Sequence, residues 1–95
     1  MALRLLLSRR AERDIDRLEE FIANETRGRA QRAMSDLSGG MRRLERFPEL
    51  GVSIGKGFRQ LYISSGKSGY VVRYRILTDA VMVVRIWHGK ENRPR

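Results

Sequence analysis

Apolar runs and stripes divide the first part of the chain into a strand and a helix. Residues 3–7 form a short apolar run that is typical of a buried strand, and Ser8 can cap a helix behind it. Apolar residues then recur every three or four positions: Ala11, Ile15, Leu18 and Ile22. This spacing predicts an amphipathic helix with one face on a core.

A second helix is predicted after a short break at residues 24–26, with Thr26 as its cap. Its apolar stripe consists of Ala30, Ala33, Met34, Leu37, Met41 and Leu44. Gly39 and Gly40 interrupt the stripe and disfavour a helix by about 1 kcal/mol each relative to alanine. They indicate either a close helix crossing or a bend. Pro48 prevents further helix. Because only a short break separates the two helices, they are expected to form a helical hairpin.

From Phe58 onward the apolar pattern has a period of two, which is typical of strands. Residues 58–63, 69–77 and 80–88 are predicted strands, joined by a loop at 64–68 and a turn at 78–79 as an antiparallel meander. Two apolar series are expected to face the helices: Tyr70, Val72, Tyr74 and Ile76, then Ala80, Met82, Val84 and Ile86. By the same alternation Arg73, Arg75 and Arg85 should be exposed on the opposite face with Trp87, and should be expendable for folding.

These elements predict an α+β fold of the order β-α-α-β-β-β, with a helical hairpin packed on one face of an antiparallel sheet. The length of 95 residues allows one domain, residues 1–95, without repeats or linkers. No apolar run approaches the roughly 20 residues of a membrane span, and Arg4 within the opening argues against a signal peptide. The chain has no cysteine, so a reducing cytoplasm is expected.

Positive charge is concentrated in the second half of the chain. The net charge is +9; residues 1–50 hold 11 Lys/Arg against 9 Asp/Glu, whereas residues 51–95 hold 9 against 2. We interpret the arginine face as a binding surface for an acidic partner such as nucleic acid, a ribosome or an acidic protein segment. Neighbouring basic residues are Lys56, Arg59, Lys67 and Lys90. The alternative is an ordinary solvated sheet surface.

Catalytic and metal chemistry has few candidates. His88, the only histidine, could act as a general acid or base, or could be a structural residue at the end of a strand. The segment 51–57 superficially resembles a phosphate-binding loop, but its spacing and the strand that follows exclude a nucleotide site. One histidine and no cysteine argue against zinc, and no cofactor is expected. The acidic residues of the first helix alternate with arginines, so we expect a solvated surface of Asp14, Asp16, Glu19 and Glu20.

The order and spacing of several short motifs resemble the ParE/RelE toxin superfamily, which includes plasmid stabilisation proteins of bacteria. The opening resembles the family in Leu5-Leu6-Leu7-Ser8 followed by Ala11, Asp14 and Leu18. Pro48-x-Leu50-Gly51 followed by Gly57-x-Arg59-x-Leu61 resembles a second family passage. The closing strands contribute Tyr70-x-Val72-x-Tyr74-Arg75 and Val81 to Ile86 with His88-Gly89.

The resemblance implies the toxin of a type II toxin–antitoxin system, with a cognate antitoxin as partner. Arg85-x-x-His88-Gly89 and the arginine before Leu61 favour the ParE branch, whose members bind and poison DNA gyrase without catalysis of their own. The target-binding candidates are then Arg59, Arg73, Arg75, Arg85, Trp87 and Lys90. The alternative, as in the RelE branch, is a ribosome-dependent mRNA endoribonuclease that uses Arg73, Arg85, His88 and Lys90. This chain lacks the aromatic residue that some nuclease members carry after His88. A third hypothesis is a non-toxic basic domain that binds nucleic acid.

Overall fold

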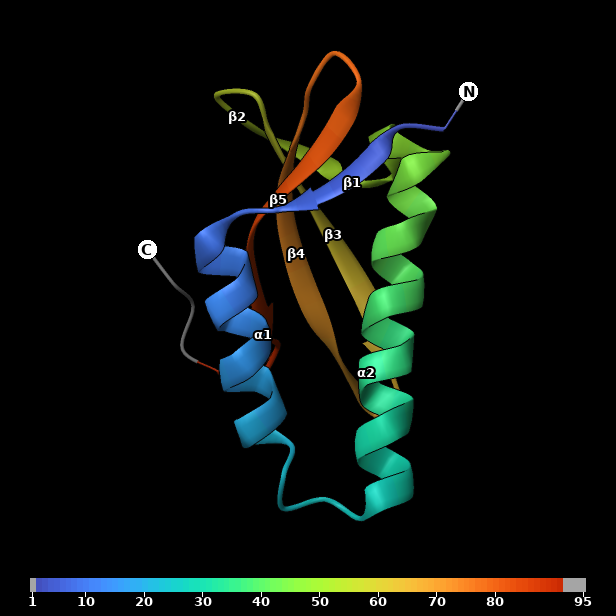
Figure 1. Ribbon diagram of the computed structural model, residues 1–95, viewed down its shortest axis with the longest axis vertical. Coiled ribbons are helices and arrows are strands. Elements are labelled where there is room, and N and C mark those ends of the chain that lie inside the picture. Colours follow the sequence, from blue (N-terminus) through green and yellow to red (C-terminus); the bar gives the residue numbers. More distant parts are fainter. Residues whose placement is uncertain (1, 92–95) are drawn as a thin grey trace.

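A computed structural model describes residues 2–91 as two helices packed on a five-stranded sheet (Figure 1). The elements in chain order are β1 (Arg4–Leu7), α1 (Arg9–Phe21), α2 (Arg27–Arg42), the short 3-10 turns η1 (Arg43–Glu45) and η2 (Pro48–Leu50), β2 (Val52–Gly55), β3 (Phe58–Ser65), β4 (Ser68–Ile76) and β5 (Ala80–His88). The α+β class and the helical hairpin are therefore confirmed. No helix within residues 2–91 is long and apolar enough to cross a membrane.

The sheet is mixed, whereas the sequence pattern had indicated an antiparallel one. Its strand order is β1-β5-β4-β3-β2, and β1 pairs with β5 in parallel, from Arg4 beside Ala80 to Leu7 beside Val83. The predicted meander of β3, β4 and β5 is antiparallel. The first and last strands of the chain therefore lie side by side. Helix α1 follows β1 directly in the sequence.

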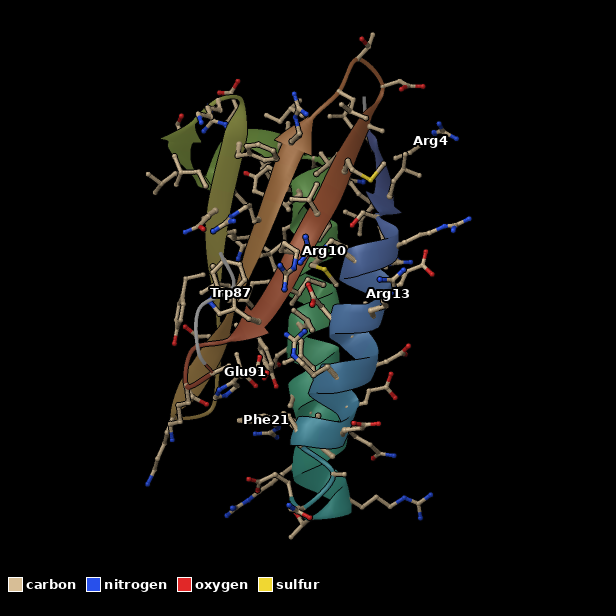
Figure 2. All side chains as sticks on the ribbon, turned by 90° about the vertical axis from the view of Figure 1, so that its left-hand side faces the viewer. Arg4, Arg10, Arg13, Phe21, Trp87 and Glu91 are labelled. Carbon is tan, nitrogen blue, oxygen red and sulfur yellow. The ribbon has the colours of Figure 1, made fainter. Side chains whose placement is uncertain are left out.

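Both helices lie on the same side of the sheet, and Figure 2 shows the helices and the sheet as two layers. The predicted caps are confirmed, since Ser8 accepts from the N–H of Ala11 and Thr26 from that of Arg29. The buried core between the layers contains Ala11, Leu18, Leu37, Met41, Leu44, Ile63, Tyr70, Val72, Tyr74, Val81, Val83 and Ile86. Gly40 allows α2 to approach β3, because a Cβ there would lie 2.6 Å from the side chain of Ile63.

A β-bulge in β5 overturns part of the predicted alternation. Arg73 pairs with Arg85, but the next residue, Tyr74, pairs with Val83, so Val84 has no partner on β4. The extra residue shifts the phase of the strand. Val81 and Val83 consequently face the helices, and the expectation that Met82 and Val84 belong to the core is wrong.

The glycine-rich segment 51–57, where no strand was predicted, forms the strand β2 and a tight turn. β2 pairs with the start of β3, and the turn between them has positive φ at Gly55, Lys56 and Gly57. Every residue of β2 is exposed, so the strand carries no apolar alternation that the sequence could reveal.

Candidate target-binding surface

The sheet face opposite the helices is hollowed between its strands. Five basic side chains line this hollow: Arg10, Lys56, Arg73, Arg75 and Arg85. Its apolar lining consists of Ile54, Phe58 and Val84. We call this surface, defined by these eight residues, the basic hollow. Arg10 extends toward it from α1, as Figure 2 shows, so the hollow is built from a helix and four strands.

Two of the arginines are held in place by aromatic rings. The guanidinium of Arg73 lies 5.1 Å from the centre of the Trp87 ring and donates two hydrogen bonds to the side-chain oxygen of Gln60. The guanidinium of Arg75 lies 5.0 Å from the centre of the Phe58 ring. Stacking and bonding of this kind reduce the conformational freedom that these side chains lose when a partner binds.

Arg85 differs from the other basic residues, because it is partnered inside the protein. Its Nε lies 2.9 Å from Oδ2 of Asp14, and only 15% of its side chain is exposed. The expectation of an exposed Arg85 is therefore wrong, and its ion pair with Asp14 predicts a contribution to folding that the sequence did not indicate. The expectation of a solvated Asp14 is also wrong, since this carboxylate is buried and pairs with Arg85 and Arg17.

Asp14 also binds the backbone of β5. Its Oδ2 accepts a hydrogen bond of 2.8 Å from the N–H of Ile86, just beyond the bulged residue. Burial would raise the pKa of this carboxyl group, but the bonds from Arg85, Ile86 and Arg17 outweigh burial and lower the pKa below its ordinary value. Asp14 is therefore ionised near neutral pH and holds both Arg85 and the backbone of β5 at Ile86.

A second ion pair ties the chain beyond β5 to α1. Arg17 donates to Glu91 at 2.8 Å and also to the carbonyl of Ile86, and Glu91 accepts from the N–H of His88. Burial would raise the pKa of Glu91, but the hydrogen bond from Arg17 outweighs it and the pKa is lowered. These contacts fix the turn that carries Gly89 and Lys90.

His88 lies on the helix side of the sheet and not in the basic hollow. It is 6% exposed, its ring packs against Tyr70 and Phe21, and its Nε2 lies 3.0 Å from the hydroxyl of Ser68. Its Nδ1 accepts from the N–H of Lys90. Burial lowers the pKa of His88, so the ring is neutral at pH 7. Both ring nitrogens of His88 therefore have hydrogen-bond partners within the protein. This geometry favours a structural role for His88 over a role as general acid or base.

The remaining candidates are distributed over the molecule. Arg59 donates to the carbonyl of Gly51 at 2.8 Å and so holds the segment before β2. Trp87 is buried, with Arg73 over its ring, and Lys90 is exposed in the turn after β5. The structure thus brings Arg73, Arg75 and Arg85 together and separates them from Arg59 and His88.

Sequence reasoning missed several residues of the basic hollow: Arg10, Ile54, Phe58 and Val84. Arg10 lies on α1, outside the predicted arginine face of the sheet, and only the three-dimensional position of α1 brings it to the hollow. Val84 was assigned to the core because the bulge leaves no mark in the apolar pattern. Within residues 2–91 there is no group of His, Cys, Asp or Glu that could hold a metal ion.

Comparison with known proteins identifies the class of protein that this fold and surface define. A family model described as ParE toxin of type II toxin-antitoxin system, parDE, matches residues 5–93. The chain is 39% identical to Toxin RelE1 of Caulobacter vibrioides over 98% of this chain and 100% of that protein. It is 36% identical to Toxin RelE3 of the same organism, over 92% and 95% of the two chains.

Solved structures agree on the fold. A chain of the chromosomal ParDE toxin–antitoxin system from P. aeruginosa superposes with a TM-score of 0.72 at 18% identity, covering 92% of this chain and 96% of that one. HP0894 from Helicobacter pylori, described as a conserved hypothetical protein, gives 0.57 at 19% identity, covering 94% and 97%.

The chain therefore belongs to the ParE toxin family, within the ParE/RelE superfamily of type II toxin–antitoxin toxins. Membership of this family implies a cognate antitoxin as its partner. It also favours a toxin over the non-toxic nucleic-acid-binding domain considered above.

Proposed function

We propose that this toxin acts by binding DNA gyrase through the basic hollow, without catalysis of its own, until the antitoxin neutralises it. The observation that carries the proposal is the separation of the basic hollow from the only histidine. The hollow offers cations and apolar side chains on a rigid sheet, whereas His88 is buried on the opposite face with both ring nitrogens bonded. Such a surface suits recognition of an acidic partner better than proton transfer.

The second candidate is an mRNA endoribonuclease, and the names of the two Caulobacter relatives favour it. That mechanism would use Arg73, Arg85, His88 and Lys90 together. In this chain Arg85 is paired with Asp14 and His88 lies on the far face of the sheet, so the four side chains do not converge. Both candidate targets work in the bacterial cytoplasm, which is the compartment we propose.

Expression of the toxin without its antitoxin in a bacterial host separates the two mechanisms. With gyrase as target, DNA synthesis stops first, and purified toxin added to gyrase and plasmid traps cleaved DNA. Messenger RNA in a translating extract then remains intact. Cuts at codon-defined positions in that extract, with normal gyrase activity, would replace the proposal by the nuclease.

Two charge-matched variants connect the effect to the surface. Arg75→Gln removes an exposed cation of the basic hollow, and Arg32→Gln removes an exposed cation from α2. Both lower the net charge equally, so a difference between them reports the location and not the total charge. We expect only Arg75→Gln to weaken the trapping of cleaved DNA.

A further inference from the structure

The strand β2 is held in a fixed position, although it adds no side chain to the core. All four of its residues, Val52–Gly55, are exposed, and none belongs to the buried cluster between the layers. The residue before it, Gly51, is bound twice: its N–H donates to the hydroxyl of Tyr74, and its carbonyl accepts from Arg59. Because β2 buries so little, we infer that its role is to hold its own side chains in position.

The turn after β2 has a strained backbone at a basic residue. Gly55 and Gly57 have φ of 92° and 82°, which glycine adopts readily, but Lys56 between them has φ of 57°. A lysine rarely adopts this left-handed conformation, which asparagine or glycine would take with less strain. Lys56 lines the basic hollow, and so does Ile54 on the strand before it. The hairpin therefore presents a cation and an apolar side chain to the same hollow.

Apolar side chains lie on both sides of the central arginines of the hollow. Ile54 and Phe58 belong to β2 and β3, and Val84 belongs to β5. The strand between them, β4, carries Arg73 and Arg75. Val84 is the unpaired residue of the bulge, and bulges commonly redirect a side chain toward a functional surface. The hollow has a volume of about 480 Å³, within the range of pockets that enclose a small ligand, so it can accept an apolar side chain of a partner.

The cations of the hollow are available to an anion. Among the described residues no acidic side chain lines the hollow, and Arg10, Lys56 and Arg75 form no ion pair within residues 2–91. Only Arg85 is already paired, with Asp14. Guanidinium groups bind carboxylates through charge-assisted hydrogen bonds, and apolar neighbours strengthen these bonds because they exclude water. An occupant that carries carboxylates therefore complements the hollow.

The apolar side chains favour a protein over a nucleic acid as this occupant. Single-stranded nucleic acids are held largely by bases that stack on aromatic rings. Here Trp87 is buried, and the guanidinium of Arg75 lies over the ring of Phe58. The apolar surface that remains accessible includes Ile54, which is 46% exposed and aliphatic. It suits an apolar side chain better than a base.

We propose that the basic hollow binds a segment of the target protein in which an apolar side chain is flanked by carboxylates. The apolar side chain packs between Ile54 and Val84, and the carboxylates pair with Lys56 and Arg75. The inference rests on the proposed function, in which the target is gyrase, and it names the kind of gyrase segment that the hollow recognises.

Two matched variants of β2 test the apolar part of the proposal. Ile54→Thr removes an apolar side chain from the hollow, whereas Val52→Thr, the control, makes the same kind of change at a residue that is 73% exposed and outside the hollow. Threonine favours a strand and neither residue is buried, so both variants should melt like wild type. The probe is purified gyrase, titrated with labelled toxin. Ile54→Thr should weaken binding about tenfold, and Val52→Thr should bind like wild type.

The salt dependence of the same titration tests the acidic part. Binding of the wild-type toxin should weaken as the salt concentration rises, because salt screens the pairs between cations and carboxylates. Arg75→Gln should bind more weakly at low salt and should reduce this dependence. Ile54→Thr keeps the charge of the hollow and should retain the full dependence.

Each of three results would overturn the inference alone. Equal binding by Ile54→Thr and Val52→Thr would mean that the apolar side chains of the hollow contact nothing in gyrase. Binding that does not respond to salt would exclude an acidic segment. Plasmid DNA that binds the toxin as tightly as gyrase does, with or without Ile54→Thr, would make nucleic acid the occupant. Absence of binding between wild-type toxin and gyrase would instead overturn the proposed function, and this inference with it.

Discussion

Asp14 on α1 and Arg85 on β5, 71 residues apart in sequence, form a buried ion pair in which Nε of Arg85 lies 2.9 Å from Oδ2 of Asp14. The same carboxylate accepts the N–H of Ile86 beside the bulge. One acidic side chain therefore fixes the position of a basic residue in the hollow and also replaces a missing strand partner.

Asp14→Ala should lower the free energy of unfolding by roughly 3 kcal/mol, because it leaves Arg85 and the Ile86 N–H without their partner in a buried position. The measurement is urea denaturation. Asp16→Ala is the matched control, since Asp16 is an exposed aspartate of the same helix, and it should stay within about 0.5 kcal/mol of wild type. Equal stability of the two variants would mean that the pair contributes nothing to folding.

Arg73 and Arg75 should matter for toxicity far more than for folding. Arg75 is exposed and Arg73 half-buried, and neither forms an ion pair within residues 2–91. The double variant Arg73→Gln/Arg75→Gln should lose toxicity while the free energy of unfolding changes by about 1 kcal/mol or less. Growth arrest and thermal melting measure the two effects. The double variant Arg32→Gln/Arg42→Gln, with the same loss of charge on α2, should remain toxic; a folded and fully toxic hollow variant would move the active surface elsewhere.

Alternation of apolar residues predicts most of the fold because most of the strands and helices have one face on the core. It fails where that condition fails. β2 is exposed along its whole length, so it has no buried face whose apolar residues would reveal a strand in the sequence. The bulge at Val84 shifts the phase of β5, which transfers Val84 to the hollow and Val83 to the core.

The candidate site could be predicted only in part, for a related reason. Strand alternation brings Arg73 and Arg75 to one face, whatever the rest of the fold does. Arg10 reaches the same hollow only through the packing of α1 beside β5, and Asp14 becomes buried for the same reason. Helix periodicity places Asp14 among alternating charges and gives no indication that an arginine far along the chain requires it.

Tyr74 should stabilise the fold through its hydroxyl group, which joins β4 to the segment before β2. The hydroxyl donates to the carbonyl of Pro48 at 2.6 Å and accepts from the N–H of Gly51 at 2.8 Å. Tyr74→Phe leaves both groups without a partner and should lower the free energy of unfolding by about 1–3 kcal/mol. Tyr62→Phe, at an exposed tyrosine of the neighbouring strand, should have almost no effect in the same urea titration. If both variants melt alike, the Pro48–Gly51 segment does not depend on Tyr74.

Stability should decrease with falling pH in two steps, and the first belongs to His88. Burial lowers the pKa of this ring below its ordinary value of 6.5. Above pH 6.5 the ring is neutral in the folded and the unfolded chain. Below it the unfolded chain binds a proton that the folded chain resists, so the free energy of unfolding decreases until the folded pKa is reached. The urea midpoint should therefore be lower at about pH 5.5 than at about pH 7.5.

The second step belongs to Asp14 and Glu91, whose pKa values in the folded chain lie below their ordinary values of 3.8 and 4.5. Their stabilising effect is present above those ordinary values and is lost as the pH falls through the folded pKa values. His88→Gln separates the two steps, because it should abolish the decrease near pH 6 and leave the decrease below pH 4.5 unchanged. Should wild type and His88→Gln lose the same stability between about pH 7.5 and about pH 5.5, the buried histidine could not be the group that titrates there.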